Sequence, residues 1–201
     1  MGAGPFGTPR MKTHSFAAII ALLAASACAS SAPPPVTMPA AQAAVCAPGL
    51  SLGKVTVAPL TRWRADQKEP EVREAIAMKA INTAFAGAPC AAGATVLPIA
   101  TDDTSVARLA QARMEGANTA ILVRIDELGP IAVVSFPALW STWSDVQFTL
   151  DVVDVATGNV VRSIPHRRQK GGAFEMRGLE PLQAEMEIAL RDVLLGDTPQ
   201  P

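Results

Sequence analysis

An alternation of apolar and polar residues over residues 144–155 (SDVQFTLDVVDV) constrains the fold of this chain more than any other feature. The apolar positions Val146, Phe148, Leu150 and Val152 alternate with polar ones, and a period of two is typical of a strand with one buried face. The segment ATGN then turns the chain into a second apolar run, NVVRSIPHRR. A strand, a Gly-containing turn and a second strand at this spacing predict a β-hairpin that packs one face against a core.

The residues before the hairpin alternate between strand patterns and helix patterns. Strand patterns occur at residues 54–60, 94–99 and 118–128, and a helix pattern separates each from the next. The first helix pattern begins at Pro70, a residue that suits a first helical turn, and the second ends at Gly116. Strands joined by helices in this order are expected to be parallel, with right-handed crossovers.

Three segments carry apolar stripes at the spacing of an α-helix. The stripes are, in chain order, Ala77, Ala80, Ile81, Ala84 and Phe85; Val106, Leu109, Ala110 and Met114; and Leu182, Met186, Ala189, Leu190, Val193 and Leu194. The sequence therefore predicts an α/β fold, a single three-helix domain on a mixed sheet, with the element order β-α-β-α-β-β-β-α. We expect this domain to occupy residues 49–196 and a short tail to follow at residues 197–201.

The amino terminus carries the features of an export signal. Met11 and Lys12 give a positive start, and an apolar run follows at residues 16–25 (FAAIIALLAA). A membrane-spanning helix needs roughly twenty apolar residues, about twice the length of this run. The small residues at 25–27 (ASA) suit signal cleavage, and Cys28 directly after them resembles the lipobox of bacterial lipoproteins, whose cysteine is diacylated.

The lipobox resemblance implies a location. Residues 1–27 are interpreted as a signal peptide with an upstream extension, and residues 28–48 as the lipidated Cys28 followed by an Ala- and Pro-rich tether. Ala29 is not the Asp that retains lipoproteins in the inner membrane of enteric bacteria. We therefore expect a lipid anchor on the periplasmic face of the outer membrane. The alternative is a plain secreted protein whose cleavage falls nearby and whose Cys28 carries no lipid.

Cys46 and Cys90 form an even pair in the part of the chain that is expected to be exported. In an oxidising compartment such a pair favours a disulfide, and each cysteine precedes a predicted strand, so both should lie at the same end of the sheet. Metal binding is the alternative, but beyond the signal peptide the chain has a single histidine, His166, and no second cysteine near either position. We expect a disulfide, no metal and no cofactor.

Charge and the spacing of reactive residues argue against several function classes. The chain has 17 basic and 18 acidic residues, a near-neutral balance that gives no basis for nucleic-acid binding. No serine stands in a nucleophile-elbow context that could serve His166. Asp102 and Asp103 directly precede a helix pattern, where acidic side chains cap backbone amides. We therefore expect a protein that is not an enzyme.

Two segments resemble a family of small bacterial envelope lipoproteins. GANTAILVRIDEL (residues 116–128) is similar to the family's Gly-Ala-Asp element with its following strand, and DVVDVATGNVV (residues 151–161) is similar to its Thr-Gly hairpin. The domain of these lipoproteins resembles the amino-terminal domain of TolB and the curli-secretion lipoprotein, and the element order matches over about residues 54–195. The resemblance implies a non-enzymatic envelope protein that binds partners or assembles into rings.

Residues 129–143 (GPIAVVSFPALWSTW) are strongly apolar and hold two of the three tryptophans. They are interpreted either as a core strand with bulges or as a projecting loop that contacts a partner or the membrane surface. The basic residues 166–170 are interpreted as a solvated loop that provides a second surface. The predicted partner-binding residues are Phe136, Trp140, Trp143, His166, Arg167 and Arg168.

Together these features predict a non-enzymatic outer-membrane lipoprotein that acts as an accessory binding module in the bacterial cell envelope. Its expected partners are the outer membrane, through the lipid anchor, and either another envelope protein or a second copy of the chain. The alternative is a homo-oligomeric, ring-forming subunit of an envelope assembly or secretion system. A hydrolase with an unrecognised site is a third interpretation.

Overall fold

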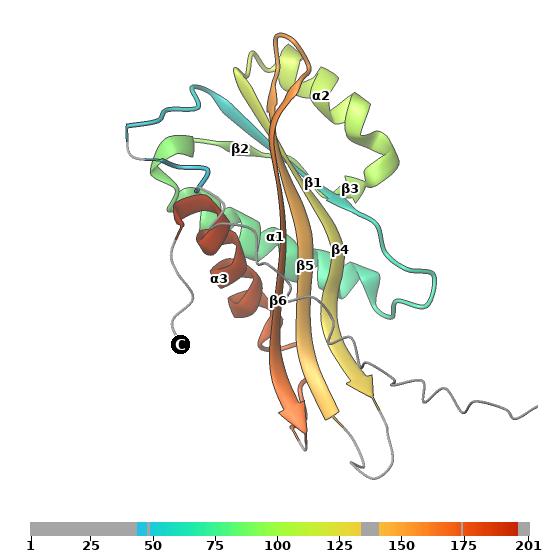
Figure 1. Ribbon diagram of the computed structural model, residues 1–201. Coiled ribbons are helices and arrows are strands. Elements are labelled where there is room, and N and C mark those ends of the chain that lie inside the picture. Colours follow the sequence, from blue (N-terminus) through green and yellow to red (C-terminus); the bar gives the residue numbers. More distant parts are fainter. Residues whose placement is uncertain (1–43, 48, 134–140, 174, 197–201) are drawn as a thin grey trace, which may run out of the picture. The chain divides into compact units, whose positions relative to one another are not determined.

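A computed structural model describes residues 44–196 of the chain, except residues 48, 134–140 and 174 (Figure 1). The described residues form one mixed sheet and three α-helices. The strands are β1 (Val55–Thr61), β2 (Thr95–Val96), β3 (Ala100–Thr101), β4 (Thr119–Val133), β5 (Ser141–Asp154) and β6 (Val160–Ala173). The helices are α1 (Pro70–Ala86), α2 (Ser105–Met114) and α3 (Leu182–Leu195). The predicted signal peptide, Cys28 and the tail lie outside the described residues.

The sheet has the strand order β2-β1-β4-β5-β6, and β3 pairs with β1 on the same side as β2. β1 is parallel to β2, β3 and β4, whereas β5 runs antiparallel to both of its neighbours, β4 and β6. The predicted α/β class, the mixed sheet and the order of elements are therefore confirmed. The parallel part comes from the helix crossovers and the antiparallel part from the hairpin.

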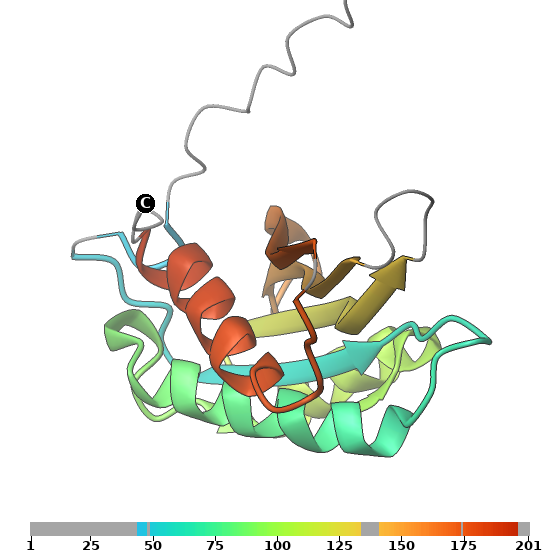
Figure 2. The same ribbon diagram turned by 90° about the horizontal axis from the view of Figure 1, so that it is seen from below.

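Helices cover the two faces of the sheet unequally. Alternate residues of β1 and β4 belong to two separate cores: Val57 and Ile121 pack with α1 and α3, whereas Ala58 and Ala120 pack near α2. α1 and α3 lie side by side over the first of these faces (Figure 2). The larger core, on that face, includes the fully buried Phe85, Phe148 and Leu190, among others. Burying such side chains contributes roughly 1.5–3 kcal/mol each to stability.

The predicted second strand, at residues 94–99, is divided into two short strands. β2 pairs with β1 at Val57, and β3 rejoins β1 at Leu60. Pro98 stands between them, and a proline lacks the backbone N–H that a ladder requires. One proline at this position therefore explains why continuous pairing stops after the amide of Leu97 has bonded to the carbonyl of Val57.

The predicted apolar stripe of α2 is wrong. Val106 and Met114 are 80% and 82% exposed, whereas Ala112 is fully buried. α2 contacts the sheet through Ala112 and Leu109, which pack in the smaller core. Of the predicted stripe, Leu109 thus packs against the sheet, whereas Val106 and Met114 face solvent.

The predicted basic loop at residues 166–170 is also wrong, because these residues lie within β6 and pair with β5. Their charges are compatible with a strand because β6 ends the path of paired strands and exposes much of its surface. Pro165 fits the same position, since a proline in a sheet is tolerated at an edge, where the missing N–H removes no ladder bond.

Cys46 and Cys90 are joined by a disulfide, as the sequence predicts, with their Cα atoms 5.2 Å apart. The chain around Cys46 also bonds to the end of α3, because the amides of Val45 and Cys46 donate to the carbonyls of Val193 and Leu194. The disulfide thus links the start of the described domain to the turn that follows α1.

Candidate functional site

β4, β5 and β6 form a long three-stranded ribbon that extends beyond the end of β1. On this extended part, one face of the ribbon has no helix packed against it within the described residues. β1 ends at Thr61, opposite Ile125, while β4 continues to Val133. A bulge between Ile125 and Glu127 reverses the alternation of β4, because one extra residue turns the following side chains to the other face. We call the resulting surface, opposite α1 and α3, the open face. Its side chains are those of Glu127, Ile131, Trp143, Asp145, Gln147, Arg167 and Gln169.

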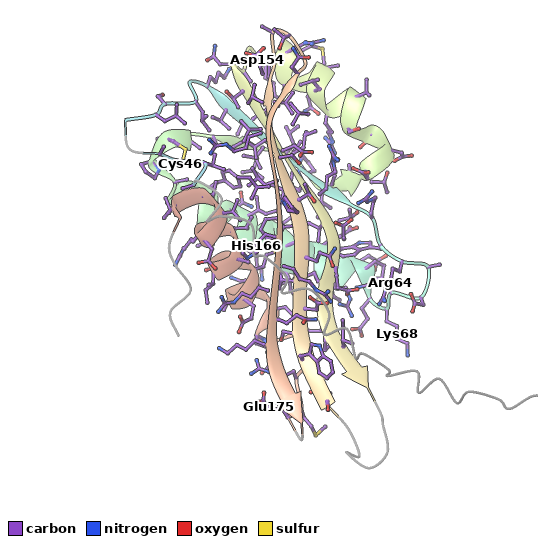
Figure 3. The ribbon with its side chains drawn as sticks, viewed as in Figure 1. Cys46, Arg64, Lys68, Asp154, His166 and Glu175 are labelled. Carbon is purple, nitrogen blue, oxygen red and sulfur yellow. A yellow bond between two sulfur atoms is a disulfide. The ribbon has the colours of Figure 1, made fainter. Side chains whose placement is uncertain are left out.

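The loop after β1, residues 62–69, lies beside β4 and forms one wall of a cleft on this face. Arg64 and Lys68 belong to this loop (Figure 3). The cleft has a volume of about 620 Å³, and its lining includes Arg62 and Arg64 from the loop and Arg167 from β6. An adjoining hollow of about 710 Å³ shares Arg64 with it and extends toward Lys68. The open face is therefore hollowed next to the loop.

An ion pair with two hydrogen bonds forms the floor of the cleft. Arg167 donates from Nε to Oδ1 of Asp145 at 3.0 Å and from Nη2 to Oδ2 at 2.6 Å. Asp145 is buried, and Gln169 donates a further hydrogen bond to its Oδ2. The hydrogen bond from Arg167 to Asp145 raises the pKa of Arg167 above its usual value. The guanidinium is thus fixed in place by a carboxylate that lies beneath it.

The loop wall is held by two further arginine–carboxylate pairs. Arg62 donates from Nε and Nη2 to Oδ1 of Asp126, at 3.0 and 2.6 Å, and this contact raises the pKa of Arg62. Arg64 places Nη2 3.3 Å from Oε2 of Glu127. Gln67 donates to the other oxygen of Glu127 at 2.7 Å. The three arginines of the cleft are therefore each paired with an acidic residue of β4 or β5.

Trp143 is the one predicted tryptophan among the described residues, and it lies in β5 rather than in a loop. It is half-buried on the open face, between Ile131 of β4 and Gly171 of β6. Residues 129–133 belong to β4, so the projecting-loop interpretation is wrong for both described ends of the apolar segment. Phe136 and Trp140 lie outside the described residues, and their role stays a prediction.

His166 and Arg168 lie on the other face of the ribbon, beneath α3. Arg168 donates from Nε to Oε2 of Glu185 at 2.9 Å and lies 3.6 Å from Asp192. The ring of His166 packs 5.4 Å from that of Phe148, and burial lowers the pKa of His166. These contacts attach α3 to β6, so the six predicted partner-binding residues do not form one surface. Arg167 and Trp143 share the open face, whereas His166 and Arg168 are engaged in packing.

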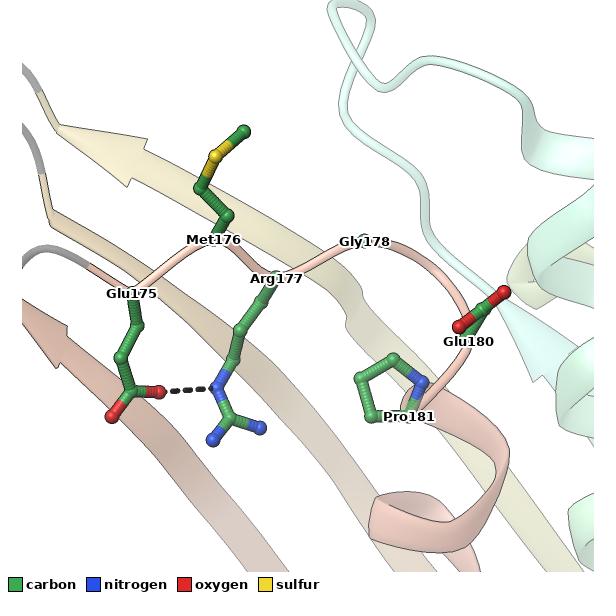
Figure 4. A pocket seen from close by; sticks show the side chains of 6 residues that line it. All are labelled: Glu175, Met176, Arg177, Gly178, Glu180 and Pro181. Atoms are coloured by element: carbon green, nitrogen blue, oxygen red, sulfur yellow. Dashed lines mark hydrogen bonds and ion pairs between the residues drawn. The ribbon is translucent and has the colours of Figure 1, made fainter.

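A further hollow lies between the end of β6 and the start of α3 (Figure 4). Arg177 and Glu175 form an ion pair at its edge, with 2.9 Å between Nε and Oε2. Met176 is exposed beside them. No residue predicted from the sequence lines this hollow.

Five charged residues of the cleft were not predicted from the sequence: Arg62, Arg64, Asp126, Glu127 and Asp145. The signal that could have indicated them is the tripeptide Arg62-Trp63-Arg64 directly after a buried strand, where two cations flank an aromatic residue. Asp145, at the start of the alternating strand, is a second signal, since an acidic residue that becomes buried in a strand requires a cationic partner.

Comparisons with known proteins give no family for this chain: no family model matches it, and no curated protein matches it. Many solved structures are similar, among them the following three. A PelC dodecamer from Paraburkholderia phytofirmans is 20% identical over 73% of this chain and 91% of that chain, with a TM-score of 0.46. A lipoprotein from Neisseria meningitidis is 15% identical over 72% and 99%, with a TM-score of 0.43. A minor lipoprotein from Acinetobacter baumannii is 14% identical over 76% and 99%, with a TM-score of 0.34.

Identities of 20% or less and TM-scores below 0.5 assign neither a family nor a function to this chain. Two of the three neighbours are described as lipoproteins, the class that the sequence resembles. The closer resemblance to TolB and the curli-secretion lipoprotein stays a prediction. Within the described residues, no helix is long and apolar enough to cross a membrane.

Proposed function

We propose that this chain is a non-enzymatic lipoprotein of the outer membrane that binds another envelope protein through the open face. The anchor is Cys28, which follows a short apolar run and three small residues. The disulfide between Cys46 and Cys90 supports export, because disulfides persist in oxidising compartments such as the periplasm. Mass spectrometry of the mature amino terminus tests the anchor: we expect a diacylated Cys28, and an unmodified end or a cut elsewhere would contradict it.

The observation that carries the binding role is the open face with its cleft, on which no helix of the described residues packs. The other face of the ribbon is covered by α1 and α3, and the cleft presents arginines next to Trp63 and Ile131. Arginine and tryptophan are enriched among the residues that dominate binding energy at protein interfaces.

The reactive groups that could suggest catalysis are engaged in structural contacts, which supports a role without chemistry. His166 packs on Phe148. Asp102 lies 3.4 Å from Arg124 and 3.8 Å from Arg62. A general base needs access to a substrate proton, and each of these groups faces another side chain of the protein.

Site-specific cross-linking in cells tests the use of the open face. A photoreactive phenylalanine analogue replaces Gln147, which lines the cleft, and in a matched control it replaces Asn82, which is exposed on α1. We expect a cross-link to one envelope protein, identified by mass spectrometry, from position 147 and not from position 82.

Two outcomes contradict the proposal in different ways. Equal cross-linking from Gln147 and Asn82 would mean that the open face is not the binding surface. A cross-link from Gln147 to a different surface of a second copy of the chain would support instead the ring-forming subunit, because head-to-tail contacts between two different patches can close into a ring.

A further inference from the structure

The arginines of the cleft are more exposed than the β4 and β5 carboxylates that pair with them, although Arg64 also lies 3.5 Å from Asp66, which is 79% exposed. The side chains of Arg62, Arg64 and Arg167 are 57%, 60% and 54% exposed. Their partners Asp126, Glu127 and Asp145 are 23%, 10% and 1% exposed. At Arg62 and Arg167 an approaching molecule meets the guanidinium before the carboxylate that pairs with it. These two arginines therefore present positive charge to a ligand although the protein as a whole is near neutral.

The geometry of the pairs leaves the outer edge of two guanidiniums directed away from the carboxylates. Arg62 and Arg167 both contact their acidic partners through the edge formed by Nε and Nη2. A guanidinium is planar and carries five N–H donors, so the amino group Nη1 lies in the same plane, on the side of the central carbon that faces away from the paired oxygen. Nη1 and Nη2 together form a fork that matches a carboxylate with two hydrogen bonds.

The pairing also reduces the cost of binding. A free arginine loses rotamer freedom when it binds a ligand, whereas Arg62 and Arg167 are already held by two hydrogen bonds each. Preorganisation of this kind raises affinity mainly by lowering the ordering cost.

The uncharged residues of the cleft favour a polypeptide as the ligand. Gln147 supplies an amide, which can both donate to and accept from a peptide backbone. Trp63 and Ile131 supply apolar surface between the arginines, and the Trp63 ring is fixed by its hydrogen bond from Nε1 to Oε1 of Glu74 at 3.0 Å. A lining of this kind suits carboxylates separated by apolar side chains along one extended chain.

We infer that the cleft between the loop at residues 62–69 and the ribbon binds an acidic, extended segment of the partner polypeptide. Its carboxylates pair with the outer edges of Arg62 and Arg167, and Arg64 adds a third cation beside them. This inference rests on the proposed function, since it names the chemistry of the partner that the open face binds.

Binding of a fluorescein-labelled oligoglutamate peptide to the purified full chain tests the inference by fluorescence anisotropy. We expect the peptide to bind, and its affinity to fall as salt rises. The double variant Arg62→Gln with Arg64→Gln should bind it at least about tenfold more weakly. Arg167 is retained in this variant, because its removal would leave the buried Asp145 unpaired.

Two control variants separate charge, geometry and folding. Arg191→Gln removes a half-exposed arginine of α3, on the other side of the sheet, and should leave peptide binding unchanged. The double variant Arg62→Lys with Arg64→Lys keeps the charges but loses the forks, and should bind with intermediate affinity. Intermediate affinity in a lysine variant also excludes general unfolding as the cause of the loss.

The inference is overturned if the glutamine variant binds oligoglutamate as tightly as the unmodified chain, or if an oligolysine peptide binds equally well. Absence of oligoglutamate binding together with a partner cross-link from Gln147 would overturn the inference and leave the proposed function standing. Arginine-dependent peptide binding without any cross-link from Gln147 in cells would overturn the proposed function alone.

Discussion

Replacing both Cys46 and Cys90 by alanine is expected to lower the free energy of unfolding by about 4 kcal/mol. The disulfide closes a loop with a sequence separation of 44 residues, and the chain-entropy account gives about this value for a loop of that length. The bond also secures the segment around Val45, which is buried in the larger core and bonds to the end of α3. Urea denaturation followed by circular dichroism measures the change.

Cys28→Ala is the matched control for this prediction. It removes the remaining cysteine, which lies outside the described domain, and should leave the urea midpoint unchanged. Treatment of the unmodified chain with a reductant should reproduce the loss seen in the double variant. Equal midpoints for the unmodified chain and the double variant would contradict the assigned contribution of the disulfide.

The elements of the fold that carry a local signal were predictable. The alternation around Phe148 is strict, and the helix that begins at Pro70 has an apolar stripe that is buried as expected. α2 was placed correctly but its face was not, because a ten-residue helix offers more than one plausible stripe. Which face of α2 is buried depends on the packing of Ala112 in the smaller core, and that contact cannot be read from the local sequence pattern.

The position of Arg168 shows the same limit for charged residues. A run of cations after a predicted strand favours a loop when only its neighbours in sequence are considered. In the fold, Glu185 lies 2.9 Å away on α3 and Asp192 about two turns further along that helix. Ion pairs with residues distant in sequence therefore allow this cationic segment to form a strand, although its local sequence favours a loop.

The cleft was unpredictable for a different reason. The bulge after Ile125 places Glu127 and Ile131 on the open face, whereas uninterrupted alternation from Ile125 would have placed them with the core. A bulge of one residue has no distinct composition here. The pairing of Arg64 with Glu127 follows from this change of register.

Gly129→Ala is expected to lower the free energy of unfolding by about 2–4 kcal/mol. A Cβ atom at this position would lie 1.6 Å from Nη1 of Arg73, far inside van der Waals contact. Arg73 is buried, and it donates from Nε to the carbonyl of Lys68 at 2.7 Å and from Nη1 to that of Leu128. Displacing its guanidinium would leave the buried carbonyl of Leu128 without its partner. Urea denaturation measures the effect.

A double-mutant cycle identifies Arg73 as the cause. Arg73→Met removes the guanidinium, so adding Gly129→Ala to it should cost less than about 1 kcal/mol, although Arg73→Met is itself destabilising. Gly178→Ala is the matched control, because a Cβ there would meet no atom within 4 Å, and it should leave the urea midpoint almost unchanged. If Gly129→Ala destabilises the Arg73→Met variant as strongly as it destabilises the unmodified chain, the steric lock between β4 and α1 does not exist. Additive losses at two contacting positions would place the strain in the backbone of β4 instead.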